Sequence, residues 1–225
     1  MIYRDKSQYI AIERILQLNL QKKPIFRIMN TYLHKCTTWS IPHWNVNTLI
    51  LGTFNPKDGP YADYYYGRVR GNGYSNQFWP SLELYLKKNN HNFSLKVGDL
   101  QSKINVMKKF KFCCKDLIKS VKTNQNNDKI IRKEFSDFAL LRPKDQREYF
   151  TNEIIDFINK NNVKKVISSW GKGSSVKLKE FRYQIEMIEN NCMDVNFNLY
   201  SLPAFGRPLI SRYKFGELLF REIST

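Results

Sequence analysis

The chain has 225 residues, 42% of them hydrophobic, and is therefore long enough to bury a sizeable core. No apolar stretch approaches the ~18 residues of a membrane span and the first residues lack a signal-peptide core, so we expect a soluble, cytoplasmic protein and no membrane partner. Thirty-seven Lys and Arg against twenty Asp and Glu leave a net charge of +17, which favours a polyanion such as DNA as partner, although a lysine- and asparagine-rich genome would produce the same excess.

The spacing of cysteines and histidines argues against metal sites and disulfides. No two cysteines have CxxC spacing, and no histidine has a cysteine or carboxylate at ligand spacing. We therefore expect no metal and no cofactor, and buried reduced thiols. The residues concerned are Cys36, Cys113, Cys114 and Cys192, with His34, His43 and His91.

The first segment is predicted to stand apart from the rest of the chain. An apolar stripe at helical spacing over residues 6–20 predicts a helix, and Pro24 bars its simple continuation. We therefore expect residues 1–44 to be an N-terminal helical extension packed on a domain that spans residues 45–225.

The domain is predicted to begin with a buried strand. Residues 47–54 hold three consecutive large aliphatic residues, a pattern typical of a parallel strand covered on both faces. Residues 79–88 are expected to be a helix with Pro80 in its first turn, and residues 89–103 are polar and read as irregular.

Strands and helices alternate through the remaining chain. A helix from Asp145 to about Lys160 is expected to begin with a capping box that Glu148 completes. A second helix, behind residues 171–175, has its apolar residues on one face. The other expected elements are strands at 164–170 and 196–203 and a closing helix at 214–223.

This alternation predicts an α/β fold: a three-layer α/β/α sandwich with a short, mainly parallel central sheet. In such sheets ligands bind beyond the carboxyl ends of the strands. Three loops should therefore converge on one site: GTFNP (52–56), SWGKGSS (169–175) and SLPAFGR (201–207).

The first loop is the most informative of the three. Gly52 permits a sharp turn at the strand end, and Pro56 fixes the next dihedral angle. Asn55 is thereby held near the sheet edge, where its amide can orient a water molecule or a polar base edge. The alternative is an ordinary Asn-Pro turn.

The second loop offers a weaker anion site. Its glycines do not have the GxxxxGK[ST] spacing of a P-loop. Ser174 or Ser175 can still cap the following helix, whose free N–H groups attract an anion, and Lys172 favours a DNA phosphate. A tight turn with a serine cap and nothing bound is the alternative.

The third loop has the composition expected of a loop that inserts a side chain between stacked bases. Pro203 stiffens a turn that exposes Ala204, Phe205 and Arg207, with Arg212 behind them. A rigid loop with one bulky side chain suits insertion into a base stack and contact with the flanking phosphates. The alternative is a surface turn whose Phe205 packs into the core.

Taken together, these segments resemble the uracil-DNA glycosylase superfamily, in particular hypoxanthine-DNA glycosylases and, secondly, mismatch-specific uracil glycosylases. The resemblance covers residues 45–220 and implies the same three-layer fold. It also implies hydrolysis of the N-glycosidic bond of a damaged base, uracil or hypoxanthine, flipped out of DNA. The matching segments are LILGTFNP (49–56), YYYGR (64–68), NQFW (76–79), CKDLIKS (114–120), VISSWG (166–171) and SLP (201–203).

The resemblance also implies roles for individual residues. Asn55 corresponds to a water-orienting asparagine and Asn76 to a catalytic amide. Ala204 departs from the pattern, since a serine is usual at its position. A base pocket is implied at Gly52, Thr53, Phe54, Tyr65, Tyr66, Phe78 and Ser169.

We accordingly expect a monofunctional DNA glycosylase of base excision repair that acts as a monomer on duplex or single-stranded DNA. One alternative is a catalytically silent nucleic-acid-binding protein on the same fold. A metal-dependent nuclease would need a carboxylate cluster, for which Asp58, Asp63 and Asp116 are the candidates, and none of them has a companion motif.

Overall fold

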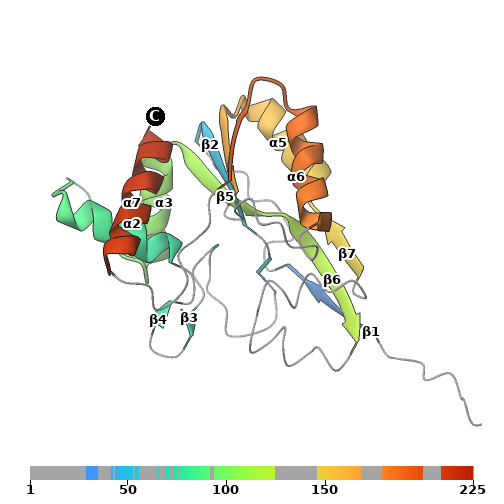
Figure 1. Cartoon of the computed structure of the whole chain (residues 1–225), viewed down its shortest axis with the longest axis horizontal. Coiled ribbons are helices and arrows are strands. Elements are labelled where there is room, and N and C mark those ends of the chain that lie inside the picture. The colour runs from blue at the N-terminus through green and yellow to red at the C-terminus, as the bar shows by residue number, and fades with distance from the viewer. Residues whose placement is uncertain are drawn as a thin grey trace, which may run out of the picture.

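The computed structural model describes a large part of the chain, and within it a parallel sheet lies between two layers of helices (Figure 1). The expected α/β fold with a short, mainly parallel sheet is confirmed. The described residues are 29–34, 42, 44–52, 54–55, 65, 69–70, 73–74, 77–91, 94–124, 146–168, 179–199 and 209–224.

The central sheet has four strands in the order β5-β2-β8-β9, and every neighbouring pair is parallel. β2 is buried along its whole length because it lies inside the sheet with helices on both faces. The predicted strands at 47–54, 164–170 and 196–203 are all present, with shorter bounds. The strands are β2 (Thr48–Gly52), β5 (Phe112–Asp116), β8 (Lys165–Ser168) and β9 (Asn196–Leu199).

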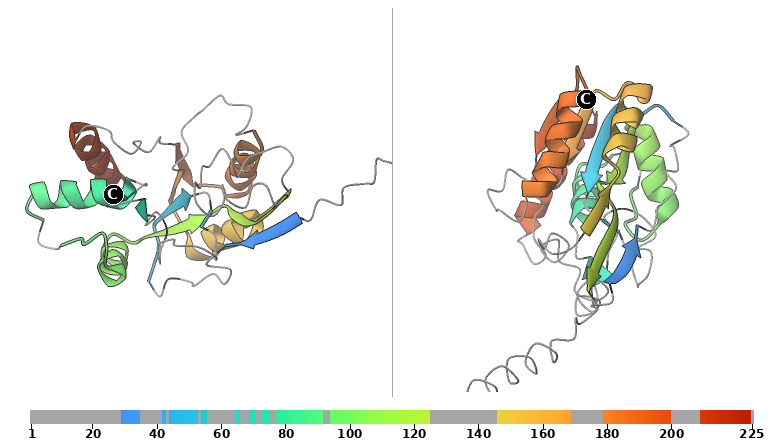
Figure 2. Two further views of the ribbon diagram at one scale, coloured as in Figure 1. Left: turned by 90° about the horizontal axis from the view of Figure 1, so that it is seen from below. Right: turned by 90° about the vertical axis from the view of Figure 1, so that its right-hand side faces the viewer.

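The two helical layers follow from the alternation of side chains along β2. Leu49 and Leu51 pack with α5 and α6, whereas Ile50 between them packs with α2, α3 and α7. Figures 1 and 2 show these two groups of helices on opposite faces of the sheet. Their bounds are α2 (Phe78–Lys88), α3 (Leu100–Lys109), α5 (Thr151–Asn161), α6 (Lys179–Asn191) and α7 (Leu209–Ser224).

An antiparallel sheet continues from the carboxyl end of β5. It has the order β1-β6-β7, and β6 follows β5 after a bend at Leu117 (Figure 1). The Leu117 N–H donates to the Gly52 carbonyl oxygen at 3.0 Å, and its own carbonyl accepts from Phe150 at 2.8 Å. The bend thus ties the two sheets together. The bounds are β1 (Met29–Leu33), β6 (Ile118–Asn124) and β7 (Gln146–Tyr149); β3 (Val69–Arg70) and β4 (Gly73–Tyr74) form a separate pair.

The predicted capping box at Asp145 and Glu148 is wrong. Residues 146–149 form β7, which pairs with β6, and Glu148 accepts a hydrogen bond from the Ser120 hydroxyl at 3.1 Å. α5 begins only at Thr151, without a side-chain cap. Because residues 146–149 pair with β6 as a strand, the helix begins only after them.

Two other boundaries also differ from prediction. Part of the polar segment expected to be irregular is α3, whose Asp99 side chain accepts from the Gln101 N–H at 3.0 Å as an N-cap. α7 begins at Leu209, earlier than expected. The predicted helix at 6–20 lies outside the described residues, and the domain boundary at residue 44 stays a prediction.

α7 packs unusually close to α2. Gly216 faces the Ser81 carbonyl, and a Cβ atom at this glycine would lie 2.0 Å from that oxygen and 2.9 Å from the Tyr85 Cβ. The position therefore accepts only glycine without movement of one helix.

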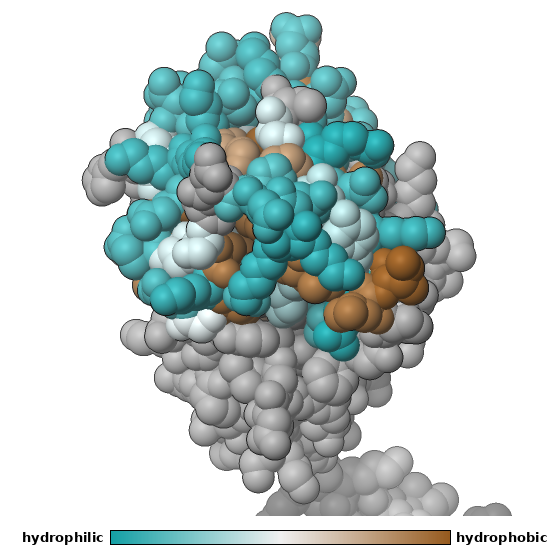
Figure 3. All heavy atoms as spheres, turned by 90° about the vertical axis from the view of Figure 1, so that its left-hand side faces the viewer, coloured by the Kyte–Doolittle hydropathy of each residue, from teal (hydrophilic) through white to brown (hydrophobic). Residues whose placement is uncertain are grey.

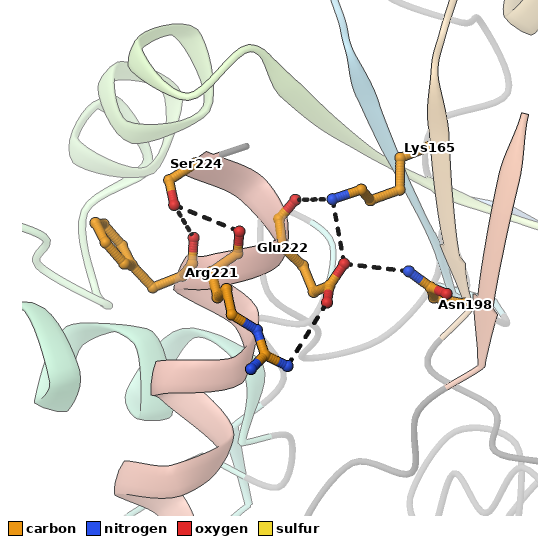
Figure 4. A network of polar contacts seen from close by, with 6 residues as sticks. Lys165, Asn198, Arg221, Glu222 and Ser224 are labelled. Atoms are coloured by element: carbon orange, nitrogen blue, oxygen red, sulfur yellow. Dashed lines mark hydrogen bonds and ion pairs between the residues drawn. The ribbon is translucent and has the colours of Figure 1, made fainter.

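A polar network fastens the last turns of α7 to β8 and β9 (Figure 4). The Glu222 carboxylate accepts from Lys165 Nζ at 3.2 Å and from Asn198 Nδ2 at 3.1 Å. Lys165 Nζ also donates to the Glu222 carbonyl oxygen at 2.9 Å. One carboxylate thus bridges two neighbouring strands.

A second polar cluster joins β7 to the first turn of α6. Arg147 pairs with the Glu180 carboxylate, which also accepts from the Tyr149 hydroxyl at 2.7 Å. Burial alone would raise the pKa of Glu180, but the hydrogen bonds from Arg147 and Tyr149 outweigh it and leave that pKa lowered. Burial, followed by the hydrogen bond to Glu180, raises the pKa of Tyr149.

Several helices end in a residue with left-handed backbone conformation. Lys111 after α3 has φ 53°, and Asn162 after α5 has φ 52°. The turn at Lys111 directs its carbonyl toward the N–H groups of Asn47 and Thr48, at 2.6 and 3.2 Å. Lys111 directly precedes β5, and two residues separate Asn162 from β8.

The expectation of buried reduced thiols is confirmed for Cys113, Cys114 and Cys192, which are buried and free. Burial raises the pKa of Cys113 to about 12, so this thiol is inert at neutral pH. Cys36 lies outside the described residues. Among the described helices, none has both the length and the apolar character that a bilayer crossing requires.

Candidate functional site

The carboxyl ends of the parallel strands mark the place where a ligand is expected. Gly52, Asp116, Ser168 and Leu199 end these strands at one edge of the sheet, called here the carboxyl edge. The chain passes from β2 to β5 on one side and then to β8 on the other side of β2. β2 and β8 therefore flank a topological switch point, which is the usual ligand position in open α/β sheets.

A buried histidine and a buried carboxylate meet at this edge. His34 Nε2 lies 2.8 Å from Asp116 Oδ2, with His34 0% and Asp116 6% exposed. Asp116 is the last residue of β5 and the register partner of Gly52. His34 directly follows β1, and its N–H donates to the Lys119 carbonyl oxygen at 2.9 Å. The pair joins the N-terminal strand to the carboxyl edge.

Among the described residues, three aromatic rings surround the imidazole of His34. Tyr65 stacks on it at 5.8 Å between ring centres and 28° between planes. Phe54 and Phe150 make T-shaped contacts with it, with 5.7 and 5.8 Å between ring centres. The rings come from the segment after β2, from residue 65 and from the start of α5. We call these five residues (His34, Asp116, Phe54, Tyr65 and Phe150) the His34 cluster.

Two residues predicted to line a base pocket belong to this cluster. Phe54 and Tyr65 are 4% and 5% exposed, so both rings pack against protein in this structure. The Tyr65 carbonyl oxygen accepts from Trp79 Nε1 at 2.7 Å, which ties this residue to α2. Gly52, a third predicted member, is the β2 residue whose carbonyl receives the Leu117 N–H.

Phe78 has a different setting from the other predicted pocket residues. Its ring is 1% exposed and packs edge-on against Trp79, at 4.9 Å, in the core between the sheet and α2. The structure therefore places Phe78 in the core. Like the rings of Phe54 and Tyr65 it packs against protein in this structure, and its role in a base pocket stays a prediction.

Asn55 lies three residues beyond the end of β2 and is half-buried. Its neighbour Phe54 is fixed in the His34 cluster, and Gly52 is fixed by Leu117. The Asn55 backbone is therefore positioned from the preceding side by a short, anchored segment.

Most of the other predicted site residues lie outside the described residues, and their roles stay predictions. Arg212 is described: it lies half-buried on α7, and its Nε atom is buried without a hydrogen-bond partner. The undescribed ones are Thr53, Tyr66, Asn76, Ser169, Lys172, Ser174, Ser175, Pro203, Ala204, Phe205 and Arg207.

Sequence reasoning missed the pairing of His34 with Asp116. Asp116 was a candidate only for a nuclease, because the buried strand that it ends and its place opposite Gly52 become visible only in the fold. His34 is 82 residues away and had no local signal. Among the described residues, no three His, Cys, Asp or Glu side chains are arranged to hold a metal ion.

Exposed lysines also lie away from the carboxyl edge, on α2, α3 and α7. The outer face of α2, α3 and α7 is mostly hydrophilic, with smaller hydrophobic patches (Figure 3). Lys87 pairs with Glu83 at 2.9 Å, and Lys88 Nζ lies 5.2 Å from the ring centre of Tyr213. Charge alone therefore does not mark the site. The exposed lysines of these helices are Lys87, Lys88, Lys108, Lys109 and Lys214.

Comparison of the chain with protein-family models, with curated proteins and with solved structures found no match. The resemblance to the uracil-DNA glycosylase superfamily accordingly rests on the sequence segments alone.

Proposed function

We propose that this protein is a monofunctional DNA glycosylase, which hydrolyses the N-glycosidic bond of a damaged base flipped out of DNA. One observation carries the proposal: Asn55 is half-buried three residues beyond the end of a buried central strand, which borders the switch point of a parallel sheet. The sequence segments that resemble the superfamily and the net charge of +17 support it further.

The chemistry needs few groups from the protein. Cleavage of a glycosidic bond passes through a sugar with oxocarbenium character, while negative charge develops on the departing base. A positioned amide such as Asn55 can orient the attacking water. Backbone N–H groups of the loop after Gly52 can donate hydrogen bonds that stabilise the negative charge on the departing base. No carboxylate base is required for this division of roles.

The remaining predicted residues fit into this scheme as proposals. Asn76 is a second amide for water or for the base edge. Lys172 and the serine-capped turn bind a phosphate, and Arg207 enters the gap that the flipped nucleotide leaves. DNA affinity then comes from phosphate contacts, and base selection comes from the pocket.

The test is direct. Purified protein is incubated with duplexes containing uracil, hypoxanthine or a mismatch, and with an undamaged duplex, each in EDTA and each followed by alkali. Strand breakage only in a damaged duplex supports the proposal. DNA binding without breakage in any duplex would instead support the alternative, a silent nucleic-acid-binding protein on this fold.

A further inference from the structure

We propose that His34 is a positioning residue for the carboxyl edge, which makes residues 29–34 part of the functional unit. Its effect on base excision rests on the proposed function, whereas its effect on the segment after β2 does not. The N-terminal strand lies outside the segments that resemble the superfamily, so the role comes from the structure alone.

The first support is the number of segments that His34 joins. Its side chain contacts the end of β5 through Asp116, the segment after β2 through Phe54, and residue 65 through the stacked Tyr65 ring. Its backbone N–H bonds to the Lys119 carbonyl on β6. A side chain that only filled space would not need a partner carboxylate.

The second support is the chemistry of the imidazole. A buried carboxylate is costly unless a donor pairs with it, and Asp116 has such a donor in His34 Nε2, at 2.8 Å. The same ring also stacks on Tyr65 and makes a T-shaped contact with Phe54. Phenylalanine would keep the ring packing but lose the bond to Asp116, whereas glutamine would keep a donor but lose the ring.

The third support is the rigidity of the element that carries His34. β1 pairs with β6 along its whole length, up to Leu33 opposite Ser120. β6 is joined to β5 through the bend at Leu117, and the Leu117 N–H holds the Gly52 carbonyl at 3.0 Å. A fixed strand on one side and a fixed bend on the other thus hold the segment that leads to Asn55.

The consequence is positional. Phe54 directly precedes Asn55, and Asp116 lies opposite Gly52, so loss of either contact with His34 loosens the segment that leads to the proposed catalytic amide. A displacement of about 1 Å in such a group is enough to cost on the order of 10²-fold in rate. His34 therefore acts on the reaction through Phe54 and Asp116.

The experiment uses the full-length protein and four variants: His34→Phe, His34→Gln, Asp116→Asn and the control Leu33→Ala. Leu33 is 44% exposed on the same strand and takes no part in the His34 cluster. Hydrogen exchange followed by mass spectrometry reports on residues 49–55, and single-turnover excision reports on the reaction.

We expect His34→Phe to speed exchange in residues 49–55 at least tenfold and to slow excision by about 10- to 100-fold, as is typical for a supporting residue behind a functional group. His34→Gln should recover part of both losses because it restores a donor to Asp116. Asp116→Asn keeps an acceptor oxygen for His34 Nε2 and should therefore speed exchange less than His34→Phe does, and Leu33→Ala should match the wild type. DNA affinity should change less than twofold in all four.

Wild-type exchange at 49–55 in His34→Phe would overturn the inference. So would an equal acceleration across the whole chain, β8 and β9 included, because it would mean general destabilisation. If the wild-type protein excises no base, the proposed function fails, and the exchange measurement still decides the role of His34.

Discussion

Replacement of Gly216 by alanine should destabilise the protein, against the usual effect of this substitution in a helix. Alanine in a helix interior is normally favoured over glycine by about 0.5–1 kcal/mol. Here the new Cβ would lie 2.0 Å from the Ser81 carbonyl oxygen and 2.7 Å from its carbon, both of them backbone atoms of α2. Overpacking of this kind typically costs about 1–3 kcal/mol, and a clash with backbone belongs at the upper end.

The net expectation for Gly216→Ala is a loss of about 2 kcal/mol in the free energy of unfolding, obtained as about 3 kcal/mol of clash less the propensity gain. In a chain of this size that loss corresponds to a fall of about 4–8 °C in Tm. Urea titration and thermal melting, both followed by circular dichroism, measure the two quantities.

The matched control for this experiment is Glu217→Ala, the next residue on α7, whose side chain is exposed. It changes helix propensity slightly and creates no clash, so its unfolding free energy should stay within about 0.5 kcal/mol of the wild type. A Gly216→Ala variant as stable as the wild type, or more stable, would refute the close packing of α2 and α7.

Four further outcomes are expected. Because the pKa of Glu180 is lowered on folding, its contribution to stability is present above its unfolded value of 4.5 and is lost as the pH falls below it; urea midpoints of Glu180→Gln should therefore fall less steeply on acidification than those of the wild type. Lys111→Gly should raise the unfolding free energy by about 0.5–1 kcal/mol, because φ 53° suits glycine, and no gain in a urea titration would count against this. Asn55→Ala should slow single-turnover excision by roughly 10²–10³ with DNA affinity nearly unchanged, and a wild-type rate would remove Asn55 from the mechanism. Arg207→Ala should slow excision from duplex but not from single-stranded DNA, so equal effects on the two substrates would exclude a wedge.

Three of the four strands of the central sheet, β2, β8 and β9, were predictable because their signal is local, whereas β5 was not predicted. β2 and β8 are apolar runs buried on both faces, and α6 repeats its apolar residues at helical spacing. β7 was not predictable, because its residues become a strand only through pairing with β6, and their own pattern favours a helix start. α3 was hidden by polar residues: two of its four buried residues are Ser102 and Lys103.

The candidate site, too, was only partly predictable from the sequence. Gly52 and Asn55 were located from the turn that ends a buried strand, a signal carried by five neighbouring residues. His34 was not located, because its role depends on β1 lying beside β6, a contact between segments far apart in the chain. Residue type and local spacing contain no information on that pairing.

The bridge from Glu222 to β8 and β9 has a consequence for self-association. β9 has a neighbour on only one side among the described strands, and a strand edge of this kind can recruit a second chain. Asn198 takes the place of the valine or isoleucine that such a strand would ordinarily carry, and Glu222 holds it from the adjacent helix. A more apolar substitute, such as Asn198→Val, would leave Glu222 bonded to Lys165 alone of the two strands and turn β9 into a better template for edge-to-edge aggregation, even where the folded protein lost little stability.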